Sequence, residues 1–581
     1  MVRERGEEQG QDLSRIDDLH DILSVEEREE LLKIVYALAD EYSCEVSSCC
    51  AYGSKISGYA RLDSDYDILL VLKGYKKKIK YVYSHGRGLD ASILVVDEDT
   101  LLNDATRSML GEFVVGRLLH PYQPLHNKEY LRHVEVLYKR RVILEELGYL
   151  INSNPLVLSN ELLIPVEYFL FSKIKKRAKV YPHALYSYIK TYISSNAARN
   201  LLLSKSGFIE ALRGLEEEGI VELVYDKDYY VRVLKRVNIS RLGSDTLKGI
   251  LAWLVHTYAG RKTLNFLREE VRSKMNRRRE IKKISIPYIF EHPSSILKLS
   301  EGDMLDGREY ITRIAESLGF RDKSRYSYTA TRLGDRHAAT VLYTMKEHDS
   351  DRIERVVIKY YTDRRAVKWI ALNLWLSSIG RRYDVSPLIR MRNEYIGIRK
   401  IRELGINTPS ILGVSFKDRI VAFRYVEGMP LSNMIDGFIN MHHNSEVLEY
   451  ITKYGSLLAL IHNHGLVLRD TKPSNVLLTS NAEDRTLYLT DFEQSSELRS
   501  INDASWDIVC FIYYSLIFTK MYDKASSIVK AFLDGYIGSC RSYDYKSILN
   551  DATRLSYSLP FYPVMTLGMI KVIRDSIKSM I

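Results

Sequence analysis

Three aspartates follow a glycine–serine pair near the start of the chain, at a spacing that suits metal-dependent chemistry. Gly53 and Ser54 come directly after a strand-like run, at a point where a helix can begin, and such a helix start suits a phosphate group. Asp65 and Asp67 follow eleven and thirteen positions after Ser54, and they share one face of an extended chain because side chains alternate. Asp90 begins the next apolar run. The pattern predicts a site for two Mg²⁺ or Mn²⁺ ions.

Such a metal pair bridges the phosphates of a nucleoside triphosphate and activates an attacking hydroxyl. The stretches "GSKISGYARLDSDYD" and "LDASIL" resemble the nucleotidyltransferase superfamily typified by DNA polymerase β, over about the first 100 residues. The resemblance implies Gly53 and Ser54 as nucleotide contacts. It also implies catalytic, metal-binding roles for Asp65, Asp67 and Asp90. The alternative interpretation is an acidic turn that caps a strand.

Other polar residues near this motif fit it less directly. Asp63 does not match a metal position of the family, and we interpret it as a turn residue. Lys76, Lys77, Lys78 and Lys80 fall between the two predicted catalytic strands and are candidates to face a triphosphate or a nucleic-acid backbone. The alternative is a lysine-rich hairpin tip that serves solubility alone.

A second group of residues, near the other end of the chain, has the spacing of phosphoryl-transfer sites. It lies in "HGLVLRDTKPSNVLL" and, after a short interval, "LYLTDFEQS". Asp470 would accept or orient the substrate hydroxyl, and Lys472 would steady the γ-phosphate. Asn475 and Asp491 would hold magnesium across the phosphates. "LRDTKPSN" and "DFE" resemble the catalytic loop and metal-binding motif of protein kinases.

The kinase resemblance extends upstream along the chain. "RVVIKYY" places Lys359 in a strand, where a kinase lysine reaches the nucleotide phosphates, and Glu394 on an amphipathic helix is its predicted partner. "IVAFRYVEGMPL" resembles the last strand and hinge of the ATP site, with backbone contacts to adenine from Tyr425 to Glu427. Gly334 in "ATRLGDRHAATVLY" is the single glycine of the predicted phosphate-covering loop.

Several residues depart from the pattern of conventional protein kinases and indicate which group of kinases the chain resembles. Asp507 follows Asp491 by 16 positions with no Ala-Pro-Glu motif, so a long activation segment does not fit. The chain therefore resembles the atypical kinases of the RIO family and of the KEOPS tRNA-modification complex. Glu493 replaces the usual glycine of the metal loop, and Leu468 replaces the histidine of the catalytic loop. Members of this group phosphorylate proteins, hydrolyse ATP as a switch or, in related antibiotic kinases, modify small molecules.

Hydrophobic patterning predicts a multidomain α/β and α+β chain. Ser24 and Glu27 form a capping box before an amphipathic helix, and three strand-like runs then predict a small mixed sheet. Helices follow, and one leads into a strand pair that resembles the end of a winged helix, with a helical packing domain and hairpin as the alternative. The basic run 272–283 reads as a linker or as a nucleic-acid contact. The predicted domains are a nucleotidyltransferase-like domain at 1–125, a middle domain with linker at 126–285, and a bilobal kinase-like domain at 286–581, its lobes meeting near 425–426.

Composition limits the class of protein. The chain has 581 residues, of which 46% are hydrophobic and 27% charged, which is ordinary for a globular protein. We expect a cytoplasmic protein without a signal peptide or membrane span. Five cysteines predict buried thiols and no disulfide framework. The scarcity of glutamine favours a thermophilic source, and the net charge of +10 suits a polyanionic partner or a merely well-solvated surface.

These observations predict a bifunctional, magnesium-dependent enzyme that uses ATP or another NTP at both ends. One end would be an atypical protein kinase or ATPase, and the other would transfer a nucleotidyl group to an unknown acceptor. Protein and RNA, with tRNA among them, are the candidate acceptors. The alternatives are a kinase with a non-catalytic RNA- or protein-binding module, and a toxin–antitoxin-like fusion in which one end silences the other. The sequence leaves the oligomeric state open.

Overall fold

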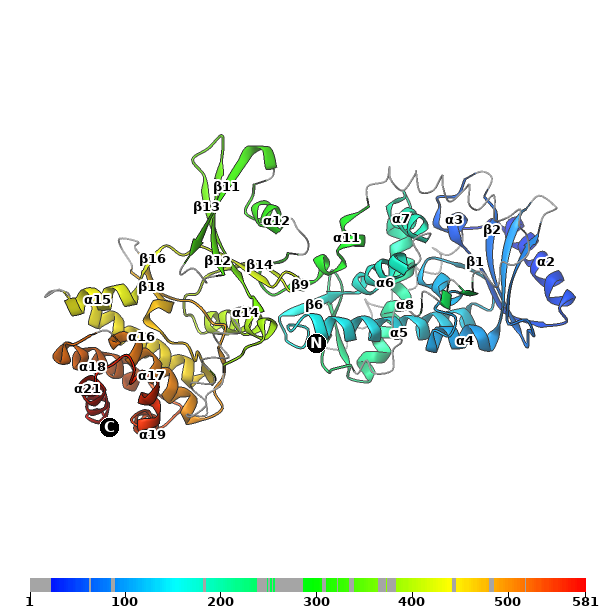
Figure 1. The fold of residues 1–581 in the computed structure, drawn as a ribbon. Coiled ribbons are helices and arrows are strands. Elements are labelled where there is room, and N and C mark those ends of the chain that lie inside the picture. The colour runs from blue at the N-terminus through cyan, green and yellow to red at the C-terminus, as the bar shows by residue number, and fades with distance from the viewer. Residues whose placement is uncertain are drawn as a thin grey trace. The chain divides into compact units, whose positions relative to one another are not determined.

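A computed structural model describes most of the chain, which forms two compact units, Met1–Leu299 and Ser300–Ile581 (Figure 1). Helices and mixed sheets occur in both units, as the fold class predicts. The described residues are 22–61, 64–84, 89–180, 184–237, 248, 251–252, 254–255, 286–305, 310–320, 322–333, 339–363, 373, 383–440, 446–479, 485–517 and 519–581. The predictions for Asp63, Gly334 and the basic run 272–283 lie outside these residues.

The first unit begins with a five-stranded sheet in the order β3-β4-β2-β1-β5. Strands β2 and β4 are parallel, and the other neighbours are antiparallel. Strand β3, which lies between β2 and β4 along the chain, was not predicted from the sequence. The two predicted catalytic strands, β2 and β4, therefore do not form a hairpin. The strands are β1 (Glu45–Tyr52), β2 (Tyr66–Lys73), β3 (Ile79–Ser84), β4 (Ala91–Asp97) and β5 (Gln123–His126).

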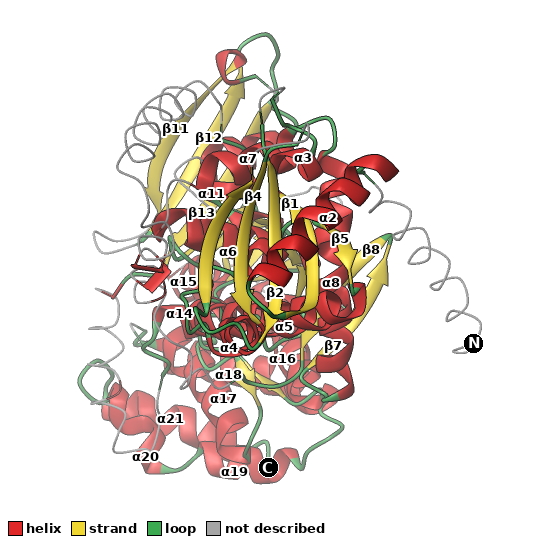
Figure 2. Ribbon diagram, turned by 90° about the vertical axis from the view of Figure 1, so that its right-hand side faces the viewer, coloured by secondary structure: helices red, strands yellow, loops and turns green. Residues whose placement is uncertain are grey.

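Helices cover both faces of this sheet. Helix α2 (Val25–Glu41) starts at the predicted capping box of Ser24 and Glu27, and its apolar side packs on Ile68 and Leu70 of β2. Figure 2 shows α2 lying across the sheet. Helices α4 and α5 contact β1, β2 and β4. The other helices around this sheet are α3 (Gly53–Ser57), α4 (Glu98–Arg107), η2 (Val115–Leu119) and α5 (Lys128–Ser153).

The rest of the first unit is helical with a small second sheet. Helix α8 leads into the hairpin of β7 and β8, as the sequence predicts, and the sheet order is β7-β8-β6-β9. Its assignment as a winged helix stays a prediction, and so does the three-domain division of the chain. The elements are β6 (Leu162–Pro165), α6 (Val166–Val180), α7 (Leu185–Ile193), α8 (Ala197–Glu217), β7 (Val221–Asp226), β8 (Asp228–Val233), α11 (Tyr288–Glu291), η4 (Pro293–Ile296) and β9 (Lys298–Leu299).

The second unit begins with a six-stranded sheet in the order β10-β14-β15-β13-β12-β11. Helix α12 closes the core of this part, where Ile314 packs against Met345 and Ile358. Helix α14 carries Glu394. The elements are β10 (Asp303–Met304), α12 (Tyr310–Ser317), η5 (Lys323–Arg325), β11 (Tyr326–Leu333), β12 (Thr340–Glu347), β13 (Ile353–Tyr360), α14 (Pro387–Glu403), β14 (Ile411–Ser415) and β15 (Ile420–Arg424).

The remainder of the second unit is mainly helical. Helices α16 and α18 pack closely because Gly455 and Gly535 each face the backbone of the other helix, with no room for a side chain. No helix in the described part of the chain combines the length and apolar character needed to cross a bilayer. The elements are β16 (Gly428–Pro430), α15 (Leu431–Asn440), α16 (Glu446–Asn463), β17 (Leu466–Val467), η7 (Pro473–Asn475), β18 (Val476–Thr479), β19 (Leu487–Leu489), β20 (Ser496–Glu497), α17 (Ile501–Leu516), α18 (Tyr522–Ser539), α19 (Tyr545–Ala552), α20 (Leu555–Ser558), η8 (Leu559–Phe561) and α21 (Leu567–Lys578).

Candidate active sites

In the first unit, Gly53 lies directly against the carboxylate of Asp67. Tyr52, the last residue of β1, pairs with Asp67 of β2, so the chain turns into α3 beside this carboxylate. Gly53 has a φ of +81°, a conformation that favours glycine, and a side chain here would collide with the Asp67 carboxylate. The predicted glycine and the half-buried Asp67 are therefore in contact.

The other two predicted carboxylates lie at the same edge of the sheet. The backbone N–H of Tyr66 donates to the Asp90 carbonyl at 2.8 Å, and Tyr66 pairs with Ala91 in the parallel ladder. Asp65 and Asp90 thus occupy matching positions just before β2 and β4, and both are exposed. Among the described residues, no three His, Cys, Asp or Glu side chains are grouped as metal ligands. The residues fit Mg²⁺ only in its usual mode, in which one or two carboxylates act with substrate phosphates and water.

The helical part of the first unit holds the end of α3 in place. Arg199 of α8 donates to the Ile56 carbonyl at 2.7 Å, and the Asn200 amide donates to the Ser57 carbonyl at 2.9 Å. These bonds satisfy carbonyls that a helix end leaves without partners. The half-buried Ser54 lies one turn earlier in the same helix. Residues far along the chain therefore fix the backbone next to Asp67.

The predicted lysines lie at the wrong end of β2 to face a triphosphate held at Asp67. Strands rise about 3.3 Å per residue, so roughly 20 Å separates Asp67 from the turn after Lys73. Lys78 instead pairs with Asp97 at 2.9 Å, and Lys80 donates to the Tyr42 hydroxyl at 3.1 Å. That prediction was wrong because β3 was missed. A nucleic-acid contact at this turn stays a prediction.

In the second unit, Lys359 of β13 is surrounded by carboxylates. Its Nζ lies 2.6 Å from Glu394 Oε2, 2.6 Å from Asp491 Oδ1 and 3.9 Å from Glu493 Oε2. The ion pair with Glu394 predicted from the sequence is present. Burial opposes the charge of Lys359, but Asp491 and Glu394 outweigh it and raise the lysine's pKa well above its usual range. Burial raises the pKa of Glu394 to about 7 despite Lys359, and Asp491 adds repulsion.

The catalytic-loop residues predicted from the sequence also lie together. Lys472 Nζ is 2.7 Å from Asp470 Oδ1, and the Asn475 side-chain amide donates to the Asp470 carbonyl at 2.8 Å. The backbone N–H of Thr490 donates to the Asn475 carbonyl at 2.9 Å, which places Asn475 next to Asp491. With its nitrogen engaged, Asn475 keeps its side-chain oxygen as a ligand. This oxygen and the one-third-exposed Asp491 carboxylate fit a magnesium ion that also takes phosphate and water ligands.

A buried aspartate on α17 shapes the catalytic loop. Asp507 accepts backbone N–H groups from Leu468 at 2.8 Å and from Arg469 at 2.6 Å, and His462 Nε2 lies 3.2 Å away. Arg469 has a φ of +62°, which non-glycine residues seldom adopt. Leu468 thus takes part in loop bracing through its backbone. Asp507 holds a strained turn directly before Asp470.

The acidic replacement in the metal loop has its own counter-charge. Glu493 Oε2 lies 3.1 Å from Arg390 Nη1, and both side chains are buried. Arg390 sits four positions before Glu394 on α14, and a second guanidinium nitrogen donates to the Thr362 carbonyl at 3.1 Å. Sequence reasoning missed Arg390. The signal was a basic residue one helical turn from the predicted lysine partner.

The predicted hinge is only partly free to bind adenine through its backbone. The N–H of Tyr425 donates to the Arg355 carbonyl at 3.0 Å, so it is already used within the fold. Glu427 is exposed, and its carboxylate lies 3.4 Å from the Arg355 guanidinium. Among the predicted hinge contacts, the Tyr425 carbonyl and the backbone near Glu427 are the groups left to test.

Comparisons with known proteins find similarity to kinase-related sequences. No protein-family model matches the chain. The chain is 33% identical over 92 residues to "Probable serine/threonine-protein kinase PknB" of Lactococcus lactis, across 15% of this chain and 14% of that protein. It is 23% identical over 156 residues to "Probable bifunctional tRNA threonylcarbamoyladenosine biosynthesis protein" of Methanococcus maripaludis, across 26% of each. The matches thus span about a quarter or less of these relatives' lengths.

A solved structure, "WaaP in complex with acyl carrier protein", aligns with 48% of this chain and 94% of its own, at 13% identity and a TM-score of 0.28. The nucleotidyltransferase resemblance stays a prediction. The chain is therefore distantly similar, over part of its length, to a serine/threonine kinase and to a tRNA-modification protein.

Proposed function

We propose that this chain is a two-headed, magnesium-dependent phosphate-transfer enzyme. Its second unit would be an atypical kinase-like phosphotransferase or ATPase, and its first unit would transfer a nucleotidyl group from an NTP. The contact of Lys359 with both Glu394 and Asp491 carries the proposal most strongly. It places a buried cation beside a carboxylate that is still one-third exposed, as phosphate binding next to a metal ion requires.

At the second unit, each residue has a proposed part. Lys359 would bind the α- and β-phosphates, and Asn475 and Asp491 would hold a magnesium ion, which would offset the negative charge of the phosphates. Asp470 orients the acceptor hydroxyl. Burial opposes the charge of Lys472, but Asp470 outweighs it and raises the pKa of the lysine, so Lys472 stays charged to steady the γ-phosphate.

At the first unit, an acceptor hydroxyl would displace pyrophosphate from the α-phosphorus of an NTP. The proposed part of Asp67, with Asp65 and Asp90, is to hold the metal ions that such a site uses. The contact between Gly53 and Asp67 supports it, because a phosphate can approach the backbone closely only where no side chain intervenes.

The acceptor of either transfer is proposed as protein or RNA, with tRNA as the RNA to test first. The net charge of +10 suits a polyanion, and relatives in Methanococcus carry names that refer to tRNA threonylcarbamoyladenosine biosynthesis. A non-catalytic first unit that presents RNA or protein is the second candidate. The exposure of Asp65 and Asp90 favours it, because exposed carboxylates carry little desolvation cost without a metal ion.

One experiment separates these functions. The full-length protein is incubated with Mg²⁺, cell extract or tRNA, and ATP labelled at either the α- or the γ-phosphate. We expect label from the α-phosphate to disappear in Asp67→Asn, and label or phosphate release from the γ-phosphate to disappear in Asp470→Asn. Each change should spare the other activity.

Exposed aspartates provide matched controls. Asp99→Asn and Asp534→Asn remove the same charge at exposed positions of the first and second units, and both should retain both activities. The non-catalytic alternative would be supported if Asp470→Asn loses the γ-phosphate activity and the wild-type protein transfers no α-label from any of the four NTPs. Wild-type protein that moves neither label and binds no nucleotide would refute both proposals.

A further inference from the structure

Four side chains form a row across the first sheet, on the face that carries Asp67. Tyr83 of β3 pairs with Ser92 of β4, Ser92 pairs with Asp67 of β2, and Asp67 pairs with Tyr52 of β1. Directly opposed residues point to the same face of a sheet. The row therefore places phenol and hydroxyl groups on both sides of the proposed metal ligand.

A guanidinium group lies over this face. Arg117 Nε donates to the Tyr52 hydroxyl at 3.1 Å, and Arg117 Nη2 donates to the Tyr81 hydroxyl at 2.7 Å. The Arg117 Cζ lies 4.5 Å from the centre of the Phe113 ring. Tyr81 is two positions before Tyr83 on β3, so both tyrosines face the same side.

Within the part of the chain that the structure describes, no carboxylate pairs with Arg117, whose contacts there are with Tyr52, Tyr81 and Phe113. Two of its five N–H groups bond to phenols, which leaves three to bind a ligand. A half-buried guanidinium without a carboxylate is costly unless an anion joins it. A planar fork of N–H donors matches phosphate oxygens.

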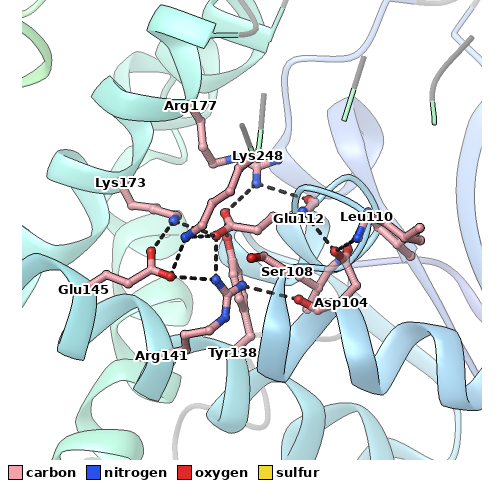
Figure 3. A network of polar contacts seen from close by, with 12 residues as sticks. Asp104, Ser108, Leu110, Glu112, Tyr138, Arg141, Glu145, Lys173, Arg177 and Lys248 are labelled. Carbon is pink, nitrogen blue, oxygen red and sulfur yellow. Dashed lines mark hydrogen bonds and ion pairs between the residues drawn. The ribbon is translucent and has the colours of Figure 1, made fainter. Parts of the chain in front are cut away.

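Hydrogen bonds fix the backbone of the segment just before Arg117. The Asp104 carboxylate accepts four backbone N–H groups, from Leu110, Glu112, Val114 and Val115, at 2.9 to 3.1 Å. Figure 3 shows this anchor beside the buried charges around Glu112.

Arg177 also holds this segment in place. Its guanidinium fills the space where a side chain at Gly116 would lie, and its Nη1 lies 3.1 Å from Glu112 Oε2. A fixed backbone reduces the entropy lost when a ligand is bound. Arg117 is therefore held in position over the sheet before any ligand arrives.

We propose that Arg117 binds the β- and γ-phosphates of the NTP at the first unit, on the face shared with Asp67. This inference rests on the proposed nucleotidyl transfer and adds a phosphate-binding residue to it. The short path from Arg117 through Tyr52 to Gly53, which touches Asp67, makes the donor triphosphate the fitting anion. The phosphates of an RNA acceptor would also bind a guanidinium group, and the tRNA-binding measurement below distinguishes this case.

The test measures binding to the full-length protein. Lys359→Met is introduced first, so that nucleotide bound by the second unit is suppressed. Affinities for the four NTPs, AMP, inorganic tripolyphosphate and tRNA are then measured with Mg²⁺, in the presence and absence of Arg117→Gln. Loss of charged hydrogen bonds should weaken NTP and tripolyphosphate binding by about ten- to a hundredfold and leave AMP and tRNA binding unchanged.

Two further variants keep the outcome decisive. Arg117→Lys, which keeps the charge but loses the fork, should bind tripolyphosphate with an intermediate affinity. Arg107→Gln removes an exposed arginine nearby and should match the parent. If Arg117→Gln fails to fold by circular dichroism, Arg117→Lys decides alone, and a parental affinity in it overturns the inference.

The remaining outcomes separate the two proposals. Equal tripolyphosphate affinity with and without Arg117 overturns the inference, while α-label transfer that depends on Asp67 leaves the function intact. Weakened AMP binding, or weakened tRNA binding alone, would assign Arg117 to the nucleoside or to the acceptor and also overturn it. No nucleotide binding by the first unit of the parent would overturn both.

Discussion

Replacing Glu112 by glutamine should markedly destabilise the first unit. The Glu112 carboxylate is buried and lies 2.7 Å from Lys173 Nζ, 2.9 Å from Arg141 Nη1 and 3.1 Å from Arg177 Nη1. Lys248 Nζ lies 3.4 Å away. Figure 3 shows these groups converging from different elements. The isosteric amide keeps the volume of the side chain but removes the negative charge.

The size of the effect follows from the charges left behind. The network holds two carboxylates, Glu112 and Glu145, against four cations, so the change leaves Glu145 alone among them. Breaking a buried ion pair by removing one partner costs about 3 to 5 kcal/mol. For a unit of this size that corresponds to a fall of about 10 °C in the unfolding midpoint.

Calorimetry and urea unfolding of the full-length protein measure this loss, with the second unit as an internal reference. Glu217→Gln, at an exposed position of α8, is the matched control and should change the free energy of unfolding by less than about 0.5 kcal/mol. A loss below about 1 kcal/mol in Glu112→Gln would refute the reasoning, because it would mean that the cations are well solvated.

Acid provides a second test of the same carboxylate. Burial opposes its charge, but Lys173 and Arg141 outweigh burial and hold the pKa of Glu112 well below its usual range. A lowered folded-state pKa stabilises the fold above the unfolded-state pKa, about 4.5, and this stabilisation is lost as the pH falls. The difference in free energy of unfolding between wild type and Glu112→Gln should therefore shrink as the pH falls below about 4.5.

Three other changes give independent tests. Arg390→Met should lower γ-phosphate activity at least about tenfold, and adding Glu493→Gly should restore part of it by removing the buried carboxylate left without its partner; additive losses would contradict this. Asp507→Asn should lower the unfolding free energy of the second unit by about 2 kcal/mol, because the loop before Asp470 loses a charged acceptor. Burial lowers the pKa of His120 from 6.5 to about 3. Between these values protons bind the unfolded chain but not the folded one, so the free energy of unfolding falls by about 1.4 kcal/mol for each pH unit below 6.5. His120→Asn should flatten this slope in urea unfolding measured as a function of pH.

Local patterns in the sequence predict several elements of the structure. The capping box at Ser24 and Glu27 marks the start of α2, and three strand-like runs predict β1, β2 and β4. The kinase resemblance predicts that Lys359 and Glu394, which are far apart in sequence, form a pair, and the two side chains are in contact. These features depend on short-range physics or on strict motif spacing, which a single sequence displays directly.

Other features depend on contacts that local patterns do not record. In α5, Arg141 and Glu145 look like an exposed i,i+4 ion pair, but both are buried. β3 was missed because Lys80 and the two tyrosines of this strand do not form a clear alternation of apolar and polar residues. Without β3, the sequence also did not show at which end of the sheet Lys78 lies. Arg117 was missed because nothing near it in sequence indicates that it reaches Tyr52 and Tyr81.

The alternation along β2 also protects the proposed site during folding. Ile68 and Leu70 face the core with α2, whereas Asp67 faces the other side. A slip of one residue against β1 would turn Asp67 into that core, whereas Leu69 and Val71, which are buried on the Asp67 face, would replace Ile68 and Leu70 beneath α2. The main penalty for a misregistered strand would thus be desolvation of the Asp67 carboxylate. The carboxylate of the proposed site therefore also helps to fix the register of its own strand.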